Sequence, residues 1–140
     1  MYKRQVFSFT PSDMTRGEFL LIRSRLGISN ADLGAALGCN VATIYRWAAG
    51  GPISDDNAAA LRQMHHQRQQ LLRDEIAATD PSNGPYRITL HDDTDALAAT
   101  DPPPALSLLD AHRAHITQLT AALDAMQLPY TITTTDEDQS

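Results

Sequence analysis

The 140-residue chain has a single cysteine, few aromatic residues (6%) and no long apolar run. One cysteine excludes an intrachain disulfide framework and a zinc site built from cysteines. A bilayer span needs roughly 20 apolar residues in succession. The first residues also lack the apolar segment of a signal peptide. We therefore expect a cytoplasmic protein with no membrane partner.

The sequence also lacks the common signatures of catalysis. It contains no nucleophile elbow, no phosphate-binding P-loop and no dinucleotide-binding glycine pattern. His112 and His115 are one helical turn apart and could share a metal, but spacing places no third ligand beside them. We expect them to be exposed helical histidines. The sequence predicts no enzyme activity, no cofactor and no metal site.

Charge is distributed unevenly along the chain. The net charge is -6, yet residues 1–54 carry six basic and three acidic side chains. Residues 80–140 carry two basic and ten acidic side chains. The first part is suited to a polyanion, whereas the last part would be repelled by one.

Three short helices are predicted between residues 15 and 50. Each begins at a residue that caps helix N-termini and ends near a glycine. The capping residues are Thr15, Ser29 and Asn40, and the glycines are Gly27, Gly38 and Gly50. Glu18 has capping-box spacing to Thr15. Gly34, within the second helix, leaves room for the third helix to approach closely.

The third of these helices has two distinct faces. Ile44 and Trp47 are one turn apart and are predicted to enter the core. This leaves Val41, Ala42, Thr43 and Arg46 on the outer face. Most of these side chains are short, so the helix can enter a groove.

Residues 28–50, with the sequence ISNADLGAALGCNVATIYRWAAG, resemble the helix-turn-helix of the Cro/C1 phage-repressor family. The resemblance extends from Met14 to about Leu61. It implies that one helix lies in the DNA major groove while polar residues around it hold phosphates. The implied DNA-binding residues are Arg23, Asn30, Asn40, Val41, Ala42, Thr43, Tyr45 and Arg46. The chain departs from the family at Ala48, where Glu is common.

The side chains of the third helix suit different parts of a base pair. Arg46 can donate two hydrogen bonds to guanine, whereas Val41 and Ala42 can contact only apolar groups such as the thymine methyl. Alternatively, Arg46 is an ordinary surface arginine with no role in DNA binding. Arg16 and Arg25 are expected to be solvated charges.

The second half is predicted to be an assembly domain. Helices are expected over residues 55–78 and 106–126, strands over residues 86–90 and 130–134, and one helical turn within residues 91–100. Two short strands are not stable alone, so they pair with each other or across a dimer, under helix 106–126. This layout also resembles the anti-CRISPR-associated autorepressors of phages, in which a dimerisation domain follows a repressor-like head. The predicted dimerisation residues are Leu71, Leu72, Ile88, Leu109, Ile116 and Ile132.

These patterns predict a mainly α protein in which a helix-turn-helix bundle precedes a small α+β dimerisation domain with two short strands. The expected divisions are an arm (1–13), a DNA-binding domain (14–60), the dimerisation domain (61–135) and an acidic tail (136–140). The expected function is a homodimeric phage or prophage repressor that occludes a promoter at a palindromic site in double-stranded DNA. Three alternatives remain: an antitoxin or adaptor whose acidic half binds a protein, a phage-packaging adaptor, and a protein that binds an RNA hairpin.

Overall fold

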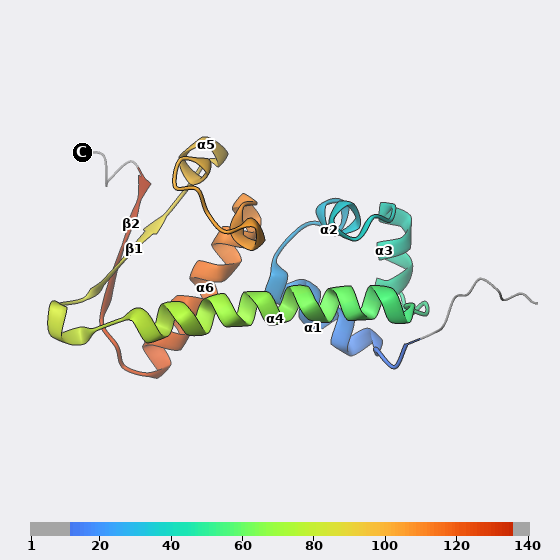
Figure 1. Ribbon diagram of the computed structural model, residues 1–140, viewed down its shortest axis with the longest axis horizontal. Coiled ribbons are helices and arrows are strands. Elements are labelled where there is room, and N and C mark those ends of the chain that lie inside the picture. The colour runs from blue at the N-terminus through green and yellow to red at the C-terminus, as the bar shows by residue number, and fades with distance from the viewer. Residues whose placement is uncertain (1–11, 136–140) are drawn as a thin grey trace, which may run out of the picture. The chain divides into compact units, whose positions relative to one another are not determined.

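The computed structural model describes residues 12–135, and the chain is mainly helical with one small sheet (Figure 1). This confirms the predicted fold class. The chain separates into two compact units between His65 and His66. The helix α4 (Asp55–Ala78) contributes its first part to the N-terminal unit and its second part to the C-terminal unit. Most of the predicted arm and the whole acidic tail lie outside the described residues.

The N-terminal unit contains α1 (Arg16–Leu26), α2 (Asn30–Leu37) and α3 (Val41–Ala48). Their N-termini are capped as the sequence predicts. Oxygen atoms of the Thr15, Ser29 and Asn40 side chains each accept a hydrogen bond from a backbone amide three residues later. Gly27 and Gly38 end α1 and α2 in the left-handed conformation, which glycine adopts without steric cost.

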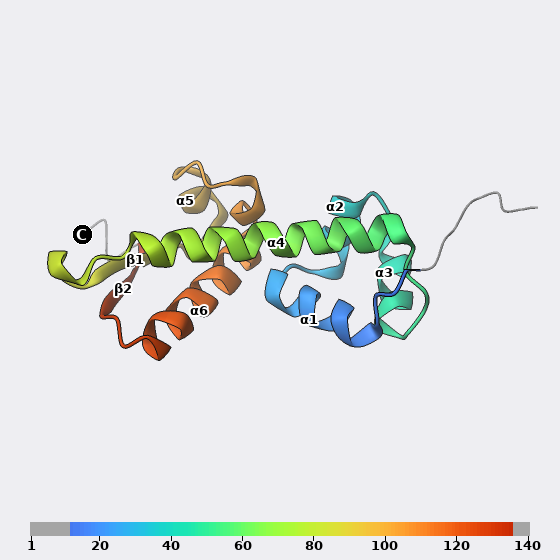
Figure 2. The same ribbon diagram turned by 60° about the horizontal axis from the view of Figure 1, so that its bottom comes forward.

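One part of the predicted capping box is replaced by an ion pair. Both Glu18 carboxylate oxygens accept hydrogen bonds from the Arg62 guanidinium, at 2.8 Å each. Arg62 also lies 3.0 Å from Asp13. These contacts join α1 to the first part of α4, which lie alongside each other (Figure 2).

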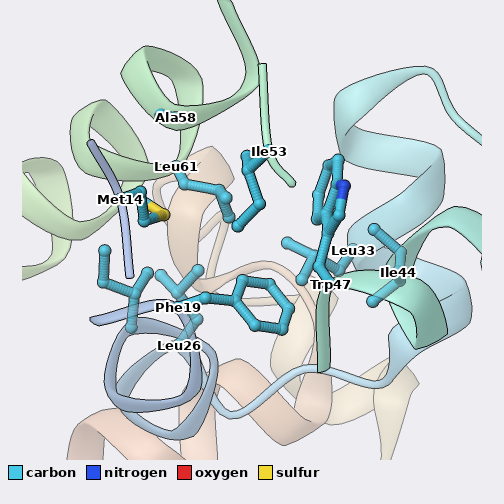
Figure 3. Packing of buried hydrophobic residues seen from close by; sticks show 10 residues of the cluster. Met14, Phe19, Leu26, Leu33, Ile44, Trp47, Ile53, Ala58 and Leu61 are labelled. Atoms are coloured by element: carbon cyan, nitrogen blue, oxygen red, sulfur yellow. The ribbon is translucent and has the colours of Figure 1, made fainter. Parts of the chain in front are cut away.

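The core of the N-terminal unit is apolar and continuous. Phe19 of α1 points toward Trp47 of α3, and their rings meet edge to face with centroids 5.8 Å apart (Figure 3). Leu33 of α2 and Ile44 of α3 are fully buried in the same cluster. Ile53 and Leu61 close it from the other side. This packing fixes α3 by one face and leaves its opposite face outside the core.

The C-terminal unit contains a two-stranded parallel sheet. Strands β1 (Tyr86–Leu90) and β2 (Tyr130–Thr134) lie side by side, with Ile88 in register with Ile132 (Figure 1). The strands therefore pair within one chain. Parallel strands require a crossover connection, which here comprises α5 (Thr94–Ala98), the 3₁₀ turn η3 (Pro104–Leu106) and α6 (Leu109–Ala125).

Helix α6 covers the sheet with its apolar residues and buries two histidines beside them. Ile116, Leu119 and Leu123 pack against Ile88 of β1. His112 and His115 are also buried, with 7% and 4% of their surface exposed. The expectation of exposed histidines was therefore wrong. Each ring finds a hydrogen-bond partner inside the unit, which makes its burial possible.

Among residues 12–135, no helix combines the length and the apolar character needed to cross a bilayer.

Candidate nucleic-acid interface

The candidate interface is the outer face of α3. Val41, Ala42, Tyr45 and Arg46 are exposed, and Thr43 is half-buried. The sequence predicted this outward orientation for all except Tyr45. No acidic residue occurs on α3, so no carboxylate on this helix would repel DNA phosphates.

Polar side chains on α3 form a short hydrogen-bonded chain. The Asn40 side-chain oxygen accepts from the Thr43 backbone amide at 3.1 Å and from the Thr43 hydroxyl at 3.2 Å. The Thr43 hydroxyl oxygen in turn accepts from Nη2 of Arg46 at 3.4 Å. Asn40, Thr43 and Arg46 are thus brought together along one line. These hydrogen bonds hold the Arg46 side chain along the surface of α3, where Arg46 is exposed.

Arg23 and Asn30, two predicted phosphate contacts, also lie together. Nη1 of Arg23 donates to Oδ1 of Asn30 at 3.3 Å, and the Arg23 guanidinium lies 5.6 Å from the centre of the Phe19 ring. Both side chains are half-buried. A cation at the N-terminus of α2, next to its backbone amides, is suited to an anion.

Sequence reasoning missed the role of Arg16. Its Nε donates a hydrogen bond to the carbonyl oxygen of Ala48 at the C-terminal end of α3. Arg16 is exposed, as expected of a solvated charge, and this hydrogen bond also links α1 to the end of α3. Arg25 also has a partner, with Nη1 3.4 Å from the His65 ring. The residues of each pair are far apart in sequence, so no local spacing could reveal either contact.

Comparisons with protein-family models and with curated proteins find no match for this chain. The local structure alone therefore has to support any functional assignment. The structure provides three capped helices, a shared core and an outer face of α3 whose one charged residue is Arg46.

The C-terminal unit contains a polar cluster in which His115 is buried and Glu75 and Tyr86 are half-buried. Glu75 accepts a hydrogen bond from the Tyr86 hydroxyl and pairs with Nε2 of His115, both at 2.8 Å. The His115 contact lowers the pKa of Glu75. Burial, followed by the bond to Glu75, raises the pKa of Tyr86 to about 12. The cluster links α4, β1 and α6 inside the unit.

His112 lies beside that cluster. Its Nε2 accepts a hydrogen bond from the backbone amide of His91 at 3.0 Å, and the two rings lie 5.1 Å apart. Burial, together with the nearby charges of His91, His115 and Arg113, lowers the pKa of His112 to about 4. The described residues contain no group of three or more His, Cys, Asp or Glu side chains placed to hold a metal ion.

The predicted dimerisation residues occupy different environments. Ile88 and Ile116 lie in the core of the unit, and Leu72 packs against that core. Leu71 and Leu109 are half-buried, and Leu71 lines a hollow of about 360 Å³ beside Pro103 and Pro104. Ile132 is the exposed member of the set, with 45% of its surface accessible.

Proposed function

We propose that this chain is a sequence-specific DNA-binding regulator of transcription, which uses α3 as its recognition helix. The observation that carries the proposal is the division of α3 into two faces. Ile44 and Trp47 fix it in the core, while Val41, Ala42 and Arg46 are exposed on its outer surface. A helix held in this way is rigid enough to read base edges, and short side chains allow it to lie deep in the major groove.

Polar side chains around α3 would supply the phosphate contacts that such a helix needs. The Arg23 side chain reaches from α1 to Asn30 at the N-terminus of α2, and Asn40 and Thr43 lie at the N-terminus of α3. Phosphate contacts set the register of a protein on DNA, whereas base contacts provide specificity. Arg46 is placed to serve as the base-reading cation.

We propose a homodimer that represses by covering a promoter, acting in the cytoplasm. One recognition helix reads only a few base pairs, whereas two helices related by a two-fold axis read a palindrome. Residues 80–140, with two basic and ten acidic side chains, would limit non-specific binding to DNA.

A pair of matched substitutions tests the DNA interface. Ala42 is exposed on α3, and Ala121 is exposed on α6. Ala42→Glu would place a carboxylate in the groove and abolish binding of the full chain to duplex DNA at near-physiological salt, whereas Ala121→Glu would bind like the unmodified protein. Equal binding by both variants, or no duplex binding by the unmodified chain, would overturn the proposal.

A second candidate function is capture of a protein partner by the acidic half. The observation that favours it is the apolar hollow lined by Leu71, Pro103, Pro104 and Ala105, within a strongly acidic part of the sequence. A basic partner with an apolar side chain would suit such a surface. Under this alternative, Ala42→Glu would leave the biological activity unchanged, and Leu71→Asp would abolish it.

A further inference from the structure

Strand β2 lies at one edge of the two-stranded sheet and carries none of the charged residues that usually protect such an edge. Proteins usually protect sheet edges with charged residues, prolines or bulges. The sequence of β2, Tyr130-Thr131-Ile132-Thr133-Thr134, contains no charge and no proline. A proline precedes each strand, Pro85 before β1 and Pro129 before β2, but only β1 carries a charged residue, Arg87. The two edges of the sheet are therefore chemically unequal.

The sheet is also small for an independent structure. Residues 12–135 contain two paired strands and no third. Sheets are normally stable with three or more strands, or when a helix covers them, and parallel sheets are usually buried on both faces. Here α6 packs against β1, while an open hollow on the sheet is lined by Arg87, Thr89, Thr131 and Thr133.

Ile132 identifies the part of the sheet that its own chain leaves uncovered. It is in register with Ile88, so both side chains project from the same face of the sheet. Ile88 is 4% exposed under α6, but Ile132 is 45% exposed. The apolar face thus extends beyond the cover that one chain supplies, and it ends at the β2 edge.

Charge limits what can cover this edge. Ten acidic side chains within residues 80–140 would oppose contact between two copies over most of their surface. Residues 126–135, which include all of β2, contain no charged side chain. Strand β2 therefore brings no charged side chain of its own into a contact between two acidic units, and the Asp124 carboxylate at its start accepts a hydrogen bond from the Tyr130 hydroxyl at 3.2 Å.

We propose that two copies of this chain pair through their β2 strands, antiparallel about a two-fold axis, and form a four-stranded sheet. In the register centred on Ile132, this residue lies opposite its counterpart, and Thr131 lies opposite the partner's Thr133. Such an interface is self-complementary, as a two-fold dimer requires. Directly opposite isoleucines and threonines are favourable cross-strand pairs. The inference gives the dimer of the proposed function a specific surface, but it can be tested without DNA.

Sedimentation of the full chain over a range of concentrations tests the surface. Ile132→Lys places a charge at the edge and is expected to weaken the dimer at least tenfold. Leu21→Lys is the matched control, because Leu21 is 48% exposed on α1 in the other unit. Unchanged circular dichroism of both variants establishes that they fold. A monomeric unmodified chain, or a dimer that Ile132→Lys does not weaken, overturns the proposal.

Cross-linking tests the register. In a chain whose single cysteine is replaced (Cys39→Ala), Ile132→Cys would place two thiols directly opposite each other, with Cβ atoms about 4.5–5.5 Å apart. Mild oxidation is expected to give a covalent dimer. Thr117→Cys, at an exposed site on α6, serves as the control and should remain largely monomeric under denaturing conditions. Equal cross-linking at both sites contradicts the register. A chain that binds duplex DNA yet dimerises elsewhere overturns this inference while the proposed function stands.

Discussion

Gly34 on α2 lies directly against the carbonyl group of Cys39, at the turn into α3. A Cβ atom at position 34 would be 2.7 Å from that oxygen, a separation that real Cβ atoms essentially never show. The oxygen belongs to the backbone, so the clash cannot be relieved by a side-chain rotation. This close approach determines the distance between α2 and α3. It therefore also determines the position of the outer face of α3 within the N-terminal unit.

Gly34→Ala is expected to lower the free energy of unfolding by about 1–3 kcal/mol, the usual cost of overpacking, despite alanine's higher helix propensity. Gly17→Ala is the matched control, because a Cβ at Gly17 would meet only the Thr15 hydroxyl, at 3.8 Å. That variant should be neutral or slightly stabilised. Denaturant unfolding of both measures the difference, and equal stability would show that α2 and α3 do not need this contact.

Arg46 is expected to determine base preference rather than simple attraction to DNA. Arg46→Lys keeps the charge but loses the two-pronged hydrogen bonding to guanine. It should bind non-specific duplex normally and lose about 1–3 kcal/mol of discrimination, or roughly 5- to 150-fold in Kd, at one base pair. Competition titrations between the preferred duplex and single-base variants measure this. Unchanged discrimination would remove Arg46 from base reading.

Val41 should make its contribution through a methyl group on the DNA. Replacing one thymine in the preferred site by uracil removes the methyl and leaves base pairing intact. The expected loss is about 0.8 kcal/mol, roughly fourfold in Kd, for the thymine that Val41 contacts. In Val41→Ala the same replacement should cost less, and uracil outside the site is the control. No thymine with a Val41-dependent penalty would mean that the exposed valine does not contact bases.

Much of the fold could be predicted from local signals. The caps at Thr15, Ser29 and Asn40 and the glycines that end α1 and α2 are short-range patterns, and the structure follows them. The strands over residues 86–90 and 130–134 also agree with the predicted bounds. Local chemistry decides where such elements begin and end, which is why a single sequence is sufficient.

Contacts between distant residues could not be predicted in the same way. Arg16 reaches Ala48, and Glu75 pairs with His115, across 32 and 40 positions. His112 can be buried because the backbone amide of His91, the residue that follows β1, donates a hydrogen bond to its ring. On the candidate interface, the outward face of α3 followed from the spacing of Ile44 and Trp47, whereas the pairing of Arg23 with Asn30 required the packed bundle.

The buried His112 is expected to make stability depend on pH. Its pKa of about 4 is below the ordinary value of 6.5, so between these values the unfolded chain binds a proton that the folded chain excludes. Stability should therefore fall as pH decreases from 6.5 toward 4, by up to about 1.4 kcal/mol per pH unit. Denaturant titrations at pH 7 and pH 5.5 measure this slope, and His112→Gln should reduce it. The pKa of Glu75 is lowered from 4.5, so this pH range lies above it. An equal slope in both proteins would contradict this expectation.

Selection of bound fragments from random duplex DNA, with the full chain and near-physiological salt, tests the central claim most directly. The account predicts a palindrome whose half-sites lie about ten base pairs, or a multiple of this, apart. It also predicts that each half-site contains a guanine on which Arg46 depends. Recovery of no motif would contradict the DNA-reading role of α3 and favour the protein-partner function.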